Sequence, residues 1–335
     1  MQRRSISRKR GTDLSIVLSG SLAFDYIMNF PGYFEDHILP DKIHVLNVSF
    51  LVESMDRQRG GVAGNIAYNL GLLQVPCRIV APAGTDFDEY SGELEALGVD
   101  VSGIWIVDDT VTASAFITTD RADNQITGFF PGAMSRAGEM SVVNNVDGVR
   151  LGVVSPTAPE AMERHVREFS EASVPYIYDP GQQIVSLSPQ ALRDGIDNAT
   201  IVVANDYEFA LIQEKTGLSR ESIVEMATYV VITFGELGSV IYHDGVSCDI
   251  PAVPPEQLVD PTGAGDAYRV GLICAMTMGL SWEVGGRLGA LMATYAIEAK
   301  GTQAHSFAPE ELTARFDASF PDFAGALVDF FNSGR

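Results

Sequence analysis

The chain has 335 residues, of which 46% are hydrophobic and 20% are charged, so it can bury the core of one large α/β domain or two ordinary ones. Its 22 Lys and Arg residues stand against 44 Asp and Glu residues, and the resulting formal charge of −22 repels phosphate backbones and anionic lipid headgroups. We therefore exclude nucleic acid and membranes as expected partners. A small anionic substrate stays open, because local amide dipoles and Mg²⁺ can outweigh the global field.

Targeting and metal-binding signals are not visible in the sequence. No apolar run reaches the roughly 18 residues needed to span a bilayer, and no apolar stretch follows the basic opening MQRRSISRKRG. Residues 1–12 are expected to form a disordered tail, whose role the sequence does not reveal. Cys77, Cys248 and Cys274 lack metal-ligand spacing, and the 5 His residues are scattered. We expect packed thiols, no zinc site and a cytoplasmic protein.

Short apolar runs alternate with helical patterns along most of the chain. The runs predict buried strands at residues 14–19, 78–81, 151–154, 176–178, 201–204 and 230–233. The helical patterns lie at residues 63–73, 89–97, 159–171, 206–215, 265–278 and 282–298. This order predicts an α/β fold with a mostly parallel central sheet and helices on both faces.

Two stretches, at about residues 25–59 and 104–130, break this rhythm because they look like alternating strands without helices between them. We interpret them as a small β-sheet lid attached to the main sheet, not as an independent domain. No internal repeat, low-complexity block or linker divides the sequence. Residues 1–335 are therefore predicted to form a single domain.

The segment DPTGAGDAYRVG, residues 260–271, carries the strongest chemical signal. Its Thr-Gly-Ala-Gly core lacks bulky side chains, so backbone N–H groups can converge on one point before the apolar helix begins. Such a turn makes an anion site, because unsatisfied amides and the helix dipole both face the ligand. Asp266 then has two interpretations: it favours the helix N-terminus electrostatically, or it accepts a proton from a hydroxyl group beside a bound phosphate.

DPTGAGDAYRVG resembles the C-terminal signature of the ribokinase-like (PfkB) family of carbohydrate and nucleoside kinases. The resemblance implies a ribokinase-like fold with ATP as co-substrate and Mg²⁺ as cofactor. It also implies that Gly263, Ala264 and Gly265 form the anion hole for the transferring phosphoryl group and that Asp266 is the catalytic base. Arg269 is bulkier than the residue that many members carry there, and the sequence does not show whether it faces solvent or the site.

Two motifs near the N-terminus resemble the family's substrate-binding elements, in the expected order. Asp25 follows the first predicted strand and resembles the substrate aspartate, whose carboxylate binds ribose hydroxyls. Gly60, Gly61 and Asn65 resemble the di-glycine hinge and the substrate-binding asparagine, and paired glycines permit the rotation that a closing lid needs. Taken alone, Asp25 is better explained as a turn or cap residue, and a tight turn before a helix is the alternative for the glycine pair.

Two later motifs resemble the nucleotide side of the family's site. Asn205 and Glu208 match its Asn-x-x-Glu element, which organises Mg²⁺ and the phosphates, Glu208 acting through water. Thr233, Gly235 and Gly238 resemble the turn that contacts ATP. Both matches are short, so Glu208 as a solvated helix residue and the glycines as strand connectors remain alternatives.

The resemblance further implies a monovalent-cation site near the anion hole, with Asp260 and Thr262 contributing to a K⁺ site. The expected partners are ATP and a small nucleoside or sugar. A monomer and a homodimer are equally compatible with the sequence, since the edge strands of a lid sheet invite pairing.

The substrate is predicted from the lid. The segments IMNFPGYFEDHI, VLNVSFLVES, GGVAGNIAYNL and AFITTDRADNQITGFFPGAM resemble bacterial and archaeal adenosine and nucleoside kinases more than ribokinase or fructokinase. This resemblance implies phosphorylation of the 5′-hydroxyl of adenosine to AMP, a step of purine salvage. A purine needs aromatic or apolar surface, for which Phe116, Phe129 and Phe130 are candidates, although each alone is better explained as core.

Other functions stay open from the sequence alone. A broad-specificity nucleoside kinase and a sugar kinase of the ribokinase or fructokinase type are alternatives within the family. A non-catalytic nucleoside- or sugar-binding protein on the same fold is the alternative from a different class. We set aside a nucleotide-dependent oxidoreductase, because no G-x-G-x-x-G follows the first predicted strand.

Overall fold

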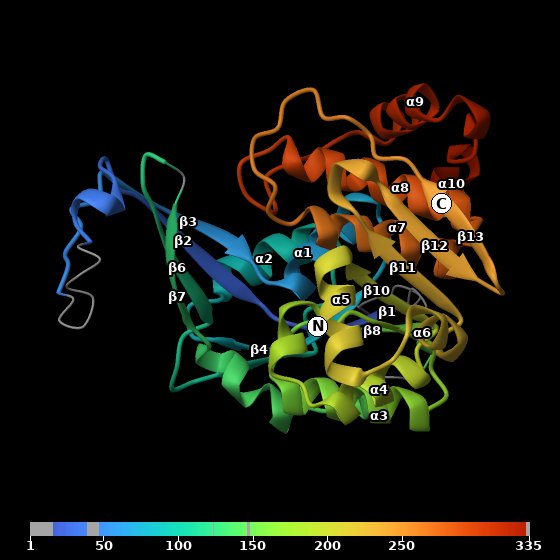
Figure 1. The fold of residues 1–335 in the computed structure, drawn as a ribbon, viewed down its shortest axis with the longest axis horizontal. Coiled ribbons are helices and arrows are strands. Elements are labelled where there is room, and N and C mark those ends of the chain that lie inside the picture. Colours follow the sequence, from blue (N-terminus) through green and yellow to red (C-terminus); the bar gives the residue numbers. More distant parts are fainter. Residues whose placement is uncertain (1–15, 39–46, 123, 146–147, 333–335) are drawn as a thin grey trace, which may run out of the picture.

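The computed structural model describes residues 16–38, 47–122, 124–145 and 148–332, which form a large α/β body with a small sheet projecting from one side (Figure 1). The predicted tail at residues 1–12 lies outside the described residues. Apart from the helices and strands given below, the described chain has 3₁₀ turns, which are η1 (Phe34–Asp36), η3 (Gly132–Glu139), η4 (Val143–Asn145), η5 (Gly181–Val185), η6 (Gly235–Leu237) and η7 (Pro321–Phe323).

The body is built on a nine-stranded sheet with the order β13-β12-β11-β10-β9-β8-β1-β4-β5 in the described part of the chain. All neighbouring pairs are parallel except β11–β12 and β12–β13, which are antiparallel at one edge. The predicted mostly parallel sheet is thereby confirmed. Its strands are β1 (Ile16–Ser19), β4 (Arg78–Gly84), β5 (Ile104–Val107), β8 (Leu151–Val154), β9 (Tyr176–Tyr178), β10 (Ile201–Asn205), β11 (Tyr229–Thr233), β12 (Ser239–His243) and β13 (Val246–Ile250).

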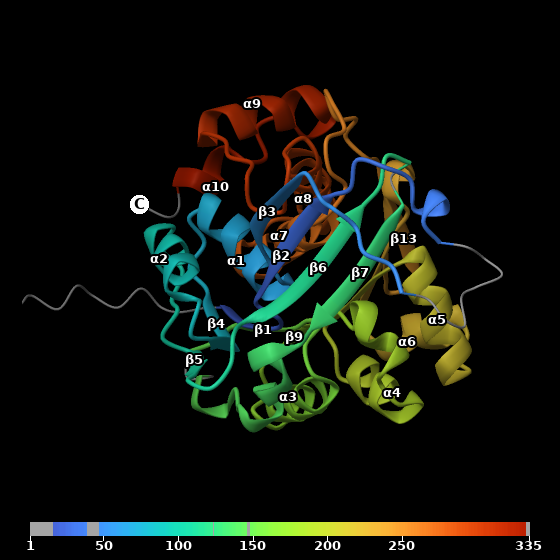
Figure 2. The ribbon, with the colours of Figure 1, turned by 90° about the vertical axis from the view of Figure 1, so that its left-hand side faces the viewer.

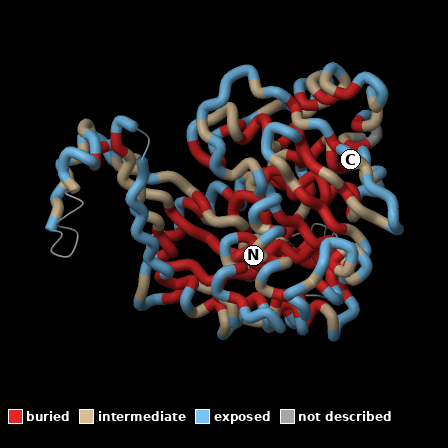
Figure 3. The backbone as a smooth tube through the Cα atoms, in the orientation of Figure 1, coloured by how far each residue is buried: buried red, intermediate tan, exposed pale blue. Residues whose placement is uncertain are grey.

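Helices cover both faces of this sheet, and the buried residues lie between the layers (Figure 3). Consecutive residues of a strand point to opposite faces and pack in different cores, as Val17 and Leu18 do in β1. One layer contains α1 (Val62–Leu72), α2 (Asp88–Ala96), α7 (Ala264–Met278), α8 (Trp282–Ile297), α9 (Pro309–Ser319) and α10 (Val328–Asn332). The other contains α3 (Pro159–Glu171), α4 (Pro189–Asp197), α5 (Asp206–Thr216) and α6 (Arg220–Met226).

The small sheet has the order β3-β2-β6-β7 and lies in front of the body when viewed from its own side (Figure 2). Its strands are β2 (Ala23–Asn29), β3 (Ser54–Gly60), β6 (Ala113–Thr119) and β7 (Gln125–Phe130). The predicted lid segment at 104–130 is too long at its start. Residues 104–107 form β5, which pairs with β4 in the large sheet, because a short alternating run does not specify which sheet it joins.

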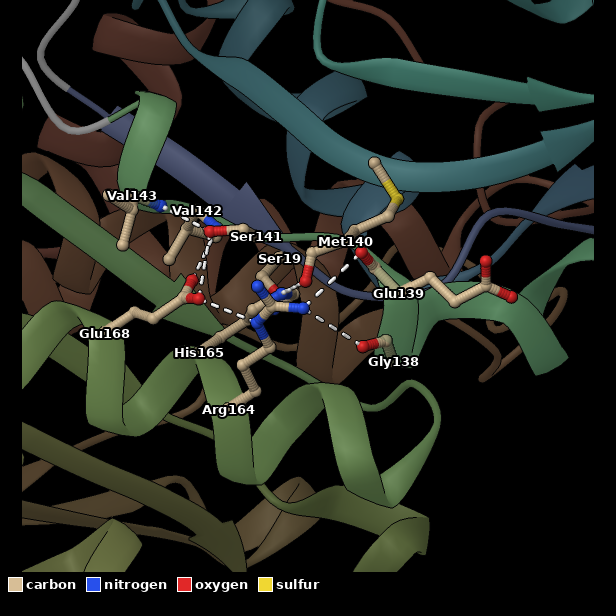
Figure 4. Close-up of polar contacts among 10 residues, drawn as sticks. All are labelled: Ser19, Gly138, Glu139, Met140, Ser141, Val142, Val143, Arg164, His165 and Glu168. Atoms are coloured by element: carbon tan, nitrogen blue, oxygen red, sulfur yellow. Dashed lines mark hydrogen bonds and ion pairs between the residues drawn. The ribbon is translucent and has the colours of Figure 1, made fainter.

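A buried polar cluster joins α3 to β1 and to the segment around residue 140 (Figure 4). His165 is buried; its Nδ1 shares a 2.6 Å hydrogen bond with Ser19 Oγ, and its Nε2 lies 3.3 Å from the carbonyl of Met140. Burial lowers the pKa of His165, which favours the neutral ring. Glu168 accepts a 2.7 Å hydrogen bond from the N–H of Val142. The hydrogen bonds of His165 and Glu168 hold the segment around residue 140 against α3.

Two further findings concern membrane-spanning helices and cysteine thiols, which were both considered from the sequence. Within the described ranges, no helix combines the length and the apolar character that a bilayer crossing requires. Cys77 and Cys274 are buried thiols and Cys248 is a partly buried one.

Parallel strands place their following loops at one edge of the large sheet. The loop after β1 leads to β2, and the residues that directly end or follow β9, β10 and β11 are Asp179, Asn205 and Thr233. The motifs at Asn205 and Thr233 therefore lie at the same edge of the sheet. In open parallel sheets this carboxyl edge is where ligands bind.

Candidate active site

The turn before α7 depends on the backbone conformation of Gly263 and on hydrogen bonds to the carboxylate of Asp260. Gly263 caps the helix with a φ of 82°, in the left-handed region that favours glycine, and a Cβ there would lie 2.9 Å from the methyl carbon of Thr302. Asp260 accepts hydrogen bonds from the N–H groups of Thr262 (3.0 Å) and Gly301 (3.1 Å). Because the first N–H groups of a helix lack partners within it, this end of α7 presents donors to an anion.

Asp266 lies in the first turn of α7, where its Oδ2 accepts a 2.7 Å hydrogen bond from Nδ2 of Asn65. Burial raises the pKa of Asp266 to about 6, with further upward contributions from Asp179 and Glu208. The positive charge of Arg269 and the bond from Asn65 oppose this rise. A carboxylate with such a pKa is ionised at neutral pH yet basic enough to accept a proton.

The amide orientation of Asn65, in α1, follows from its partners. Its Oδ1 accepts from Thr302 Oγ1 (2.8 Å) and from Gln303 Nε2 (2.9 Å), so its NH₂ group must face Asp266. Gln303 also donates to the hydroxyl of Tyr90, which donates in turn to the carbonyl of Gly60 (3.0 Å). A buried hydrogen-bond chain thus links the proposed hinge to the proposed base.

Asp25 lies in β2 beside the hinge. Burial, and then the charge of Asp260, raise the pKa of Asp25 to about 6. A Cβ on Gly60 would lie 2.6 Å from the Asp25 carboxylate, so glycine is needed for this approach. Gly61 has a φ of 87°, and a Cβ there would lie 2.6 Å from the backbone nitrogen of Ala23. Gly61 is therefore required by close backbone packing, whereas Gly60 leaves room for the side chain of Asp25.

Asn205 and Glu208 form the capping box of α5. Asn205 Oδ1 accepts from the N–H of Glu208 (2.7 Å), and Glu208 Oε2 accepts from the N–H of Asn205 (2.9 Å). Burial raises the pKa of Glu208. The pair has a structural role, and the cavity described below also exposes both side chains to a ligand.

Thr233 ends β11, and the turn that follows it depends on glycine. Gly235 has a φ of 58° and Gly238 a φ of 92°, both in the region that side chains rarely adopt. A Cβ on Gly238 would also collide with the carbonyl of Ile250. These glycines shape the turn between β11 and β12.

A cavity of about 170 Å³ gathers much of the predicted site. Six predicted residues line it, and they are Asn205, Glu208, Thr233, Gly263, Gly265 and Asp266. Asn65 reaches this group through its bond to Asp266. Ala264 is the first residue of α7. Gly61, Gly235 and Gly238 are not among the described residues that line the cavity, and Asp25 lies on the small sheet.

Sequence reasoning missed four polar residues of the site, which are Asp179, Thr302, Gln303 and Tyr90. Arg269, whose direction the sequence left open, is buried and forms an ion pair with Asp179 at the cavity wall. Asp179 directly follows β9, so its place after a parallel strand was a usable signal. The others carried none, because their partners are remote in sequence.

Metal binding by the protein alone is not evident. Within the described ranges, no group of three or more His, Cys, Asp or Glu side chains is arranged to hold a metal ion. Mg²⁺ is usually held by one or two carboxylates together with water and phosphate oxygens. The carboxylate of Glu208 and the amide oxygen of Asn205 at the cavity are oxygen donors of the kind that this binding mode uses.

Comparisons with known proteins agree with this geometry. A family model described as pfkB family carbohydrate kinase matches residues 22–310. A nucleoside kinase of Methanothermobacter thermautotrophicus is 31% identical over 312 residues, covering 92% of this chain and 97% of the relative.

The solved structures of two nucleoside kinases are similar to this chain over most of its length. The nucleoside kinase of Burkholderia thailandensis in complex with inosine is 39% identical, with a TM-score of 0.83 and coverage of 92% of this chain and 98% of that one. The nucleoside kinase of Methanocaldococcus jannaschii is 27% identical, with a TM-score of 0.83 and coverage of 92% and 100%.

Proposed function

The chain belongs to the PfkB family of carbohydrate kinases, and from that premise we propose that it transfers the γ-phosphoryl group of ATP to the 5′-hydroxyl of adenosine. Members of the family phosphorylate hydroxyl groups with ATP, so the kinase reaction itself follows from membership. The choice of a nucleoside is our proposal. The observation that carries the proposed transfer is the hydrogen bond between Asn65 and Asp266, because it joins the proposed substrate-binding asparagine to the proposed base.

In the proposed reaction, Asp266 accepts the proton of the 5′-hydroxyl while the nucleoside oxygen forms a bond to the γ-phosphorus. The bond from that phosphorus to the β–γ bridging oxygen breaks, and its electron pair leaves with ADP. The free amides of the turn at Gly263 and Gly265 donate to the phosphoryl oxygens, where charge is concentrated. Asp266 lies in the same helix turn, which supports its role as base.

The register of the small sheet supports an acceptor that carries ribose. Asp25 is in register with Gln58 of β3 and Ala115 of β6, and Ala115 with Phe129 of β7, so these four side chains share one face. On the same face Asp56 pairs with Lys300 of the body at 2.6 Å, so this face contacts the body there. Asp25 can there bind the vicinal hydroxyls of a ribose and leave the 5′-hydroxyl for Asp266.

The same register separates the three aromatic candidates for the nucleobase. Phe129 lies on the face of Asp25 and is 53% exposed. Phe116 stacks on Tyr26, with ring centroids 5.0 Å apart, on the opposite face, and Phe130 also lies on that face. Phe129 is two strands from Asp25, roughly 10 Å away at the usual strand spacing. This separation suits a ribose and its base, so we propose Phe129 as the aromatic surface for the purine.

Closure of the small sheet over the substrate belongs to the same proposal. Gly60 and Gly61 absorb the rotation, and the chain from Gly60 through Tyr90 and Gln303 to Asn65 transmits it to the base. Closure excludes water and limits wasteful hydrolysis of ATP. Amide hydrogen exchange in β2, β3, β6 and β7 should slow when adenosine is added. Unchanged exchange at saturating adenosine would contradict a moving lid.

We propose Mg²⁺ bound to the phosphates of ATP, with Glu208 contacting it through water and Asn205 beside it. When bound, the metal neutralises phosphate charge. Excess EDTA should abolish activity, and Glu208→Gln should raise the Mg²⁺ concentration needed for half-maximal rate. We also retain Asp260 and Thr262 as a K⁺ site, for which replacement of K⁺ by choline is the test.

One acceptor screen tests the substrate directly. Adenosine, inosine, guanosine, cytidine, ribose and fructose are each supplied with ATP and Mg²⁺, and release of ADP is measured. Adenosine should give the highest kcat/KM, whereas a higher value for ribose or fructose would refute a nucleoside acceptor. A broad nucleoside kinase is the second candidate, favoured by the B. thailandensis relative with inosine bound. No acceptor-dependent ADP release at all would favour a non-catalytic binding protein.

A further inference from the structure

Arg269 is the one positively charged side chain among the described residues that line the cavity beside Asp266. It lies three residues after Asp266 on α7, while Asp179, Glu208 and Asp266 bring three carboxylates to the same cavity. A polyphosphate that enters this cavity is repelled unless cations offset those charges. Mg²⁺ can supply part of the positive charge that offsets these carboxylates, and Arg269 supplies positive charge from the protein itself.

The guanidinium of Arg269 is held from one side. Its Nη2 donates to Oδ1 of Asp179 at 2.6 Å, and its Nε forms an ion pair with Oδ2. Asp179 is buried, and its N–H donates to the carbonyl of Val154 at 2.9 Å, which fixes it at the carboxyl edge of the sheet. A guanidinium carries five N–H donors in one plane, so this side-on pair leaves both donors of Nη1 unused.

The unused nitrogen of Arg269 points to the glycine turn. A Cβ on Gly265 would lie 2.8 Å from Nη1 of Arg269, and no hydrogen bond from Nη1 is found within the described ranges. Gly265 lies in the first turn of α7, where the backbone N–H groups have no intrahelical partner and no side-chain cap. Nη1 therefore adds donors to that same space, and lysine, with a single nitrogen, could not bind Asp179 side-on and reach the turn at once.

Stability alone does not account for this pair. Replacing a buried ion pair with apolar residues of similar volume is often neutral or stabilising, because both charges lose their hydration. We propose that Arg269 binds the γ-phosphoryl group of ATP through Nη1 and that Asp179 positions it. The proposal rests on the proposed function, since it takes this cavity as the phosphoryl site. Arg269 exchanges no proton in the reaction; its charge offsets that on the equatorial oxygens during transfer.

The test is a charge-neutral double variant, Arg269→Gln with Asp179→Asn, made in the full chain. It removes the ion pair without leaving either Arg269 or Asp179 as a buried charge that lacks its partner, and the two amides can still bond to each other. Its matched control is Arg315→Gln with Glu298→Gln, which removes a side-on pair with bonds of 2.7 Å and 2.6 Å between the C-cap of α8 and α9; neither residue lines the cavity. Thermal unfolding checks both folds. Arg269→Lys is measured in parallel, because it keeps a charge beside Asp179 if the double variant fails to fold.

The expected result separates the γ-phosphate from the rest of the nucleotide. The Arg269/Asp179 double variant should bind ADP within about threefold of wild type, lose at least tenfold in affinity for ATP, and lose on the order of 100-fold in kcat, the scale of one removed phosphoryl donor. Arg269→Lys should also lose at least tenfold in kcat. A folded variant with near-wild-type kcat, or with equal losses for ADP and ATP, would overturn the assignment.

The binding arm of this experiment uses ATP and ADP without any nucleoside. If wild type phosphorylates no nucleoside but its preference for ATP over ADP depends on Arg269, the proposed acceptor is wrong and the Arg269 assignment stands. If wild type phosphorylates adenosine and both Arg269 variants do so at the wild-type rate, the reverse holds.

Discussion

The strands β1, β8 and β9 of the large sheet are buried along their whole length, whereas every residue of β7 in the small sheet is exposed. The polar residues differ in the same way. Asp266 and Asp179 each have side-chain partners in the body, while no hydrogen bond to the Asp25 carboxylate is found within the described ranges. The carboxylates of the body are therefore oriented by partners within the protein, whereas we propose that the carboxylate of Asp25 finds its partners in the ligand. The comparison predicts that changes in the body affect turnover and changes in the lid affect acceptor binding.

The largest effect is expected in the body. Asp266→Asn keeps the size of the side chain and its polarity at the helix terminus, but it removes the proposed proton acceptor. We expect kcat to fall by at least ~100-fold, the scale of general-base loss. Nucleoside affinity, measured by calorimetry, should change little. An unchanged kcat in the folded variant would contradict the assignment.

The second effect is expected in the lid. Asp25→Ala removes the carboxylate that we propose accepts hydrogen bonds from ribose hydroxyls, so KM for adenosine should rise by about 10- to 100-fold, as for a hydrogen bond to a charged group worth ~1.5–3 kcal/mol. KM for ATP should stay nearly constant. Asp36→Ala, which removes an exposed aspartate of the same region, serves as the control. If the control has the same effect, Asp25 has no special role.

The body was the more predictable region from sequence, for a physical reason. Strands buried on both faces read as continuous apolar runs, and the predicted ranges 151–154 and 176–178 coincide with β8 and β9. The turn at 263–265 was visible because glycine there is a local requirement of backbone geometry. In contrast, the alternating pattern at 104–107 predicted a lid strand and was wrong, since periodicity does not identify the partner strand.

The contacts of the site were the least predictable part. Arg269 meets Asp179 across 90 positions, and Gln303 meets Asn65 across 238. No local pattern encodes such pairs, because each forms only when separate β–α units converge at the carboxyl edge of the sheet. Asp266 could be predicted because its motif is contiguous, whereas the residues that orient it are spread over the chain.

The third prediction concerns the pH dependence of activity, to which one carboxylate in each region contributes. The pKa values of Asp266 and Asp25 are both raised to about 6, in each case chiefly by burial. Each must be ionised to act, so activity should be full above pH 7 and kcat/KM for adenosine should fall about tenfold per pH unit below pH 6 for one group, more steeply for two.

The two regions can then be separated by variant. Asp25→Asn should flatten the steeper fall in kcat/KM to that of one group, while the fall in kcat that depends on Asp266 remains. Circular dichroism at each pH checks that the protein stays folded. A flat kcat profile down to pH 5 would contradict Asp266 as the base.

The smallest expected effect tests the lid at one residue. Phe129 shares a face with Asp25, and Phe116 lies on the opposite face against Tyr26. Phe129→Ala should raise KM for adenosine about fivefold, because an aromatic contact contributes ~1 kcal/mol beyond burial, and should leave kcat and KM for ATP unchanged. Phe116→Ala removes the same ring from a similarly exposed position, 42% against 53%, and should leave KM for adenosine near wild type. Any residual activity on ribose, which has no base, should respond to neither change. If Phe116→Ala raises KM for adenosine more than Phe129→Ala does, the base lies on the other face and our orientation of the lid is wrong.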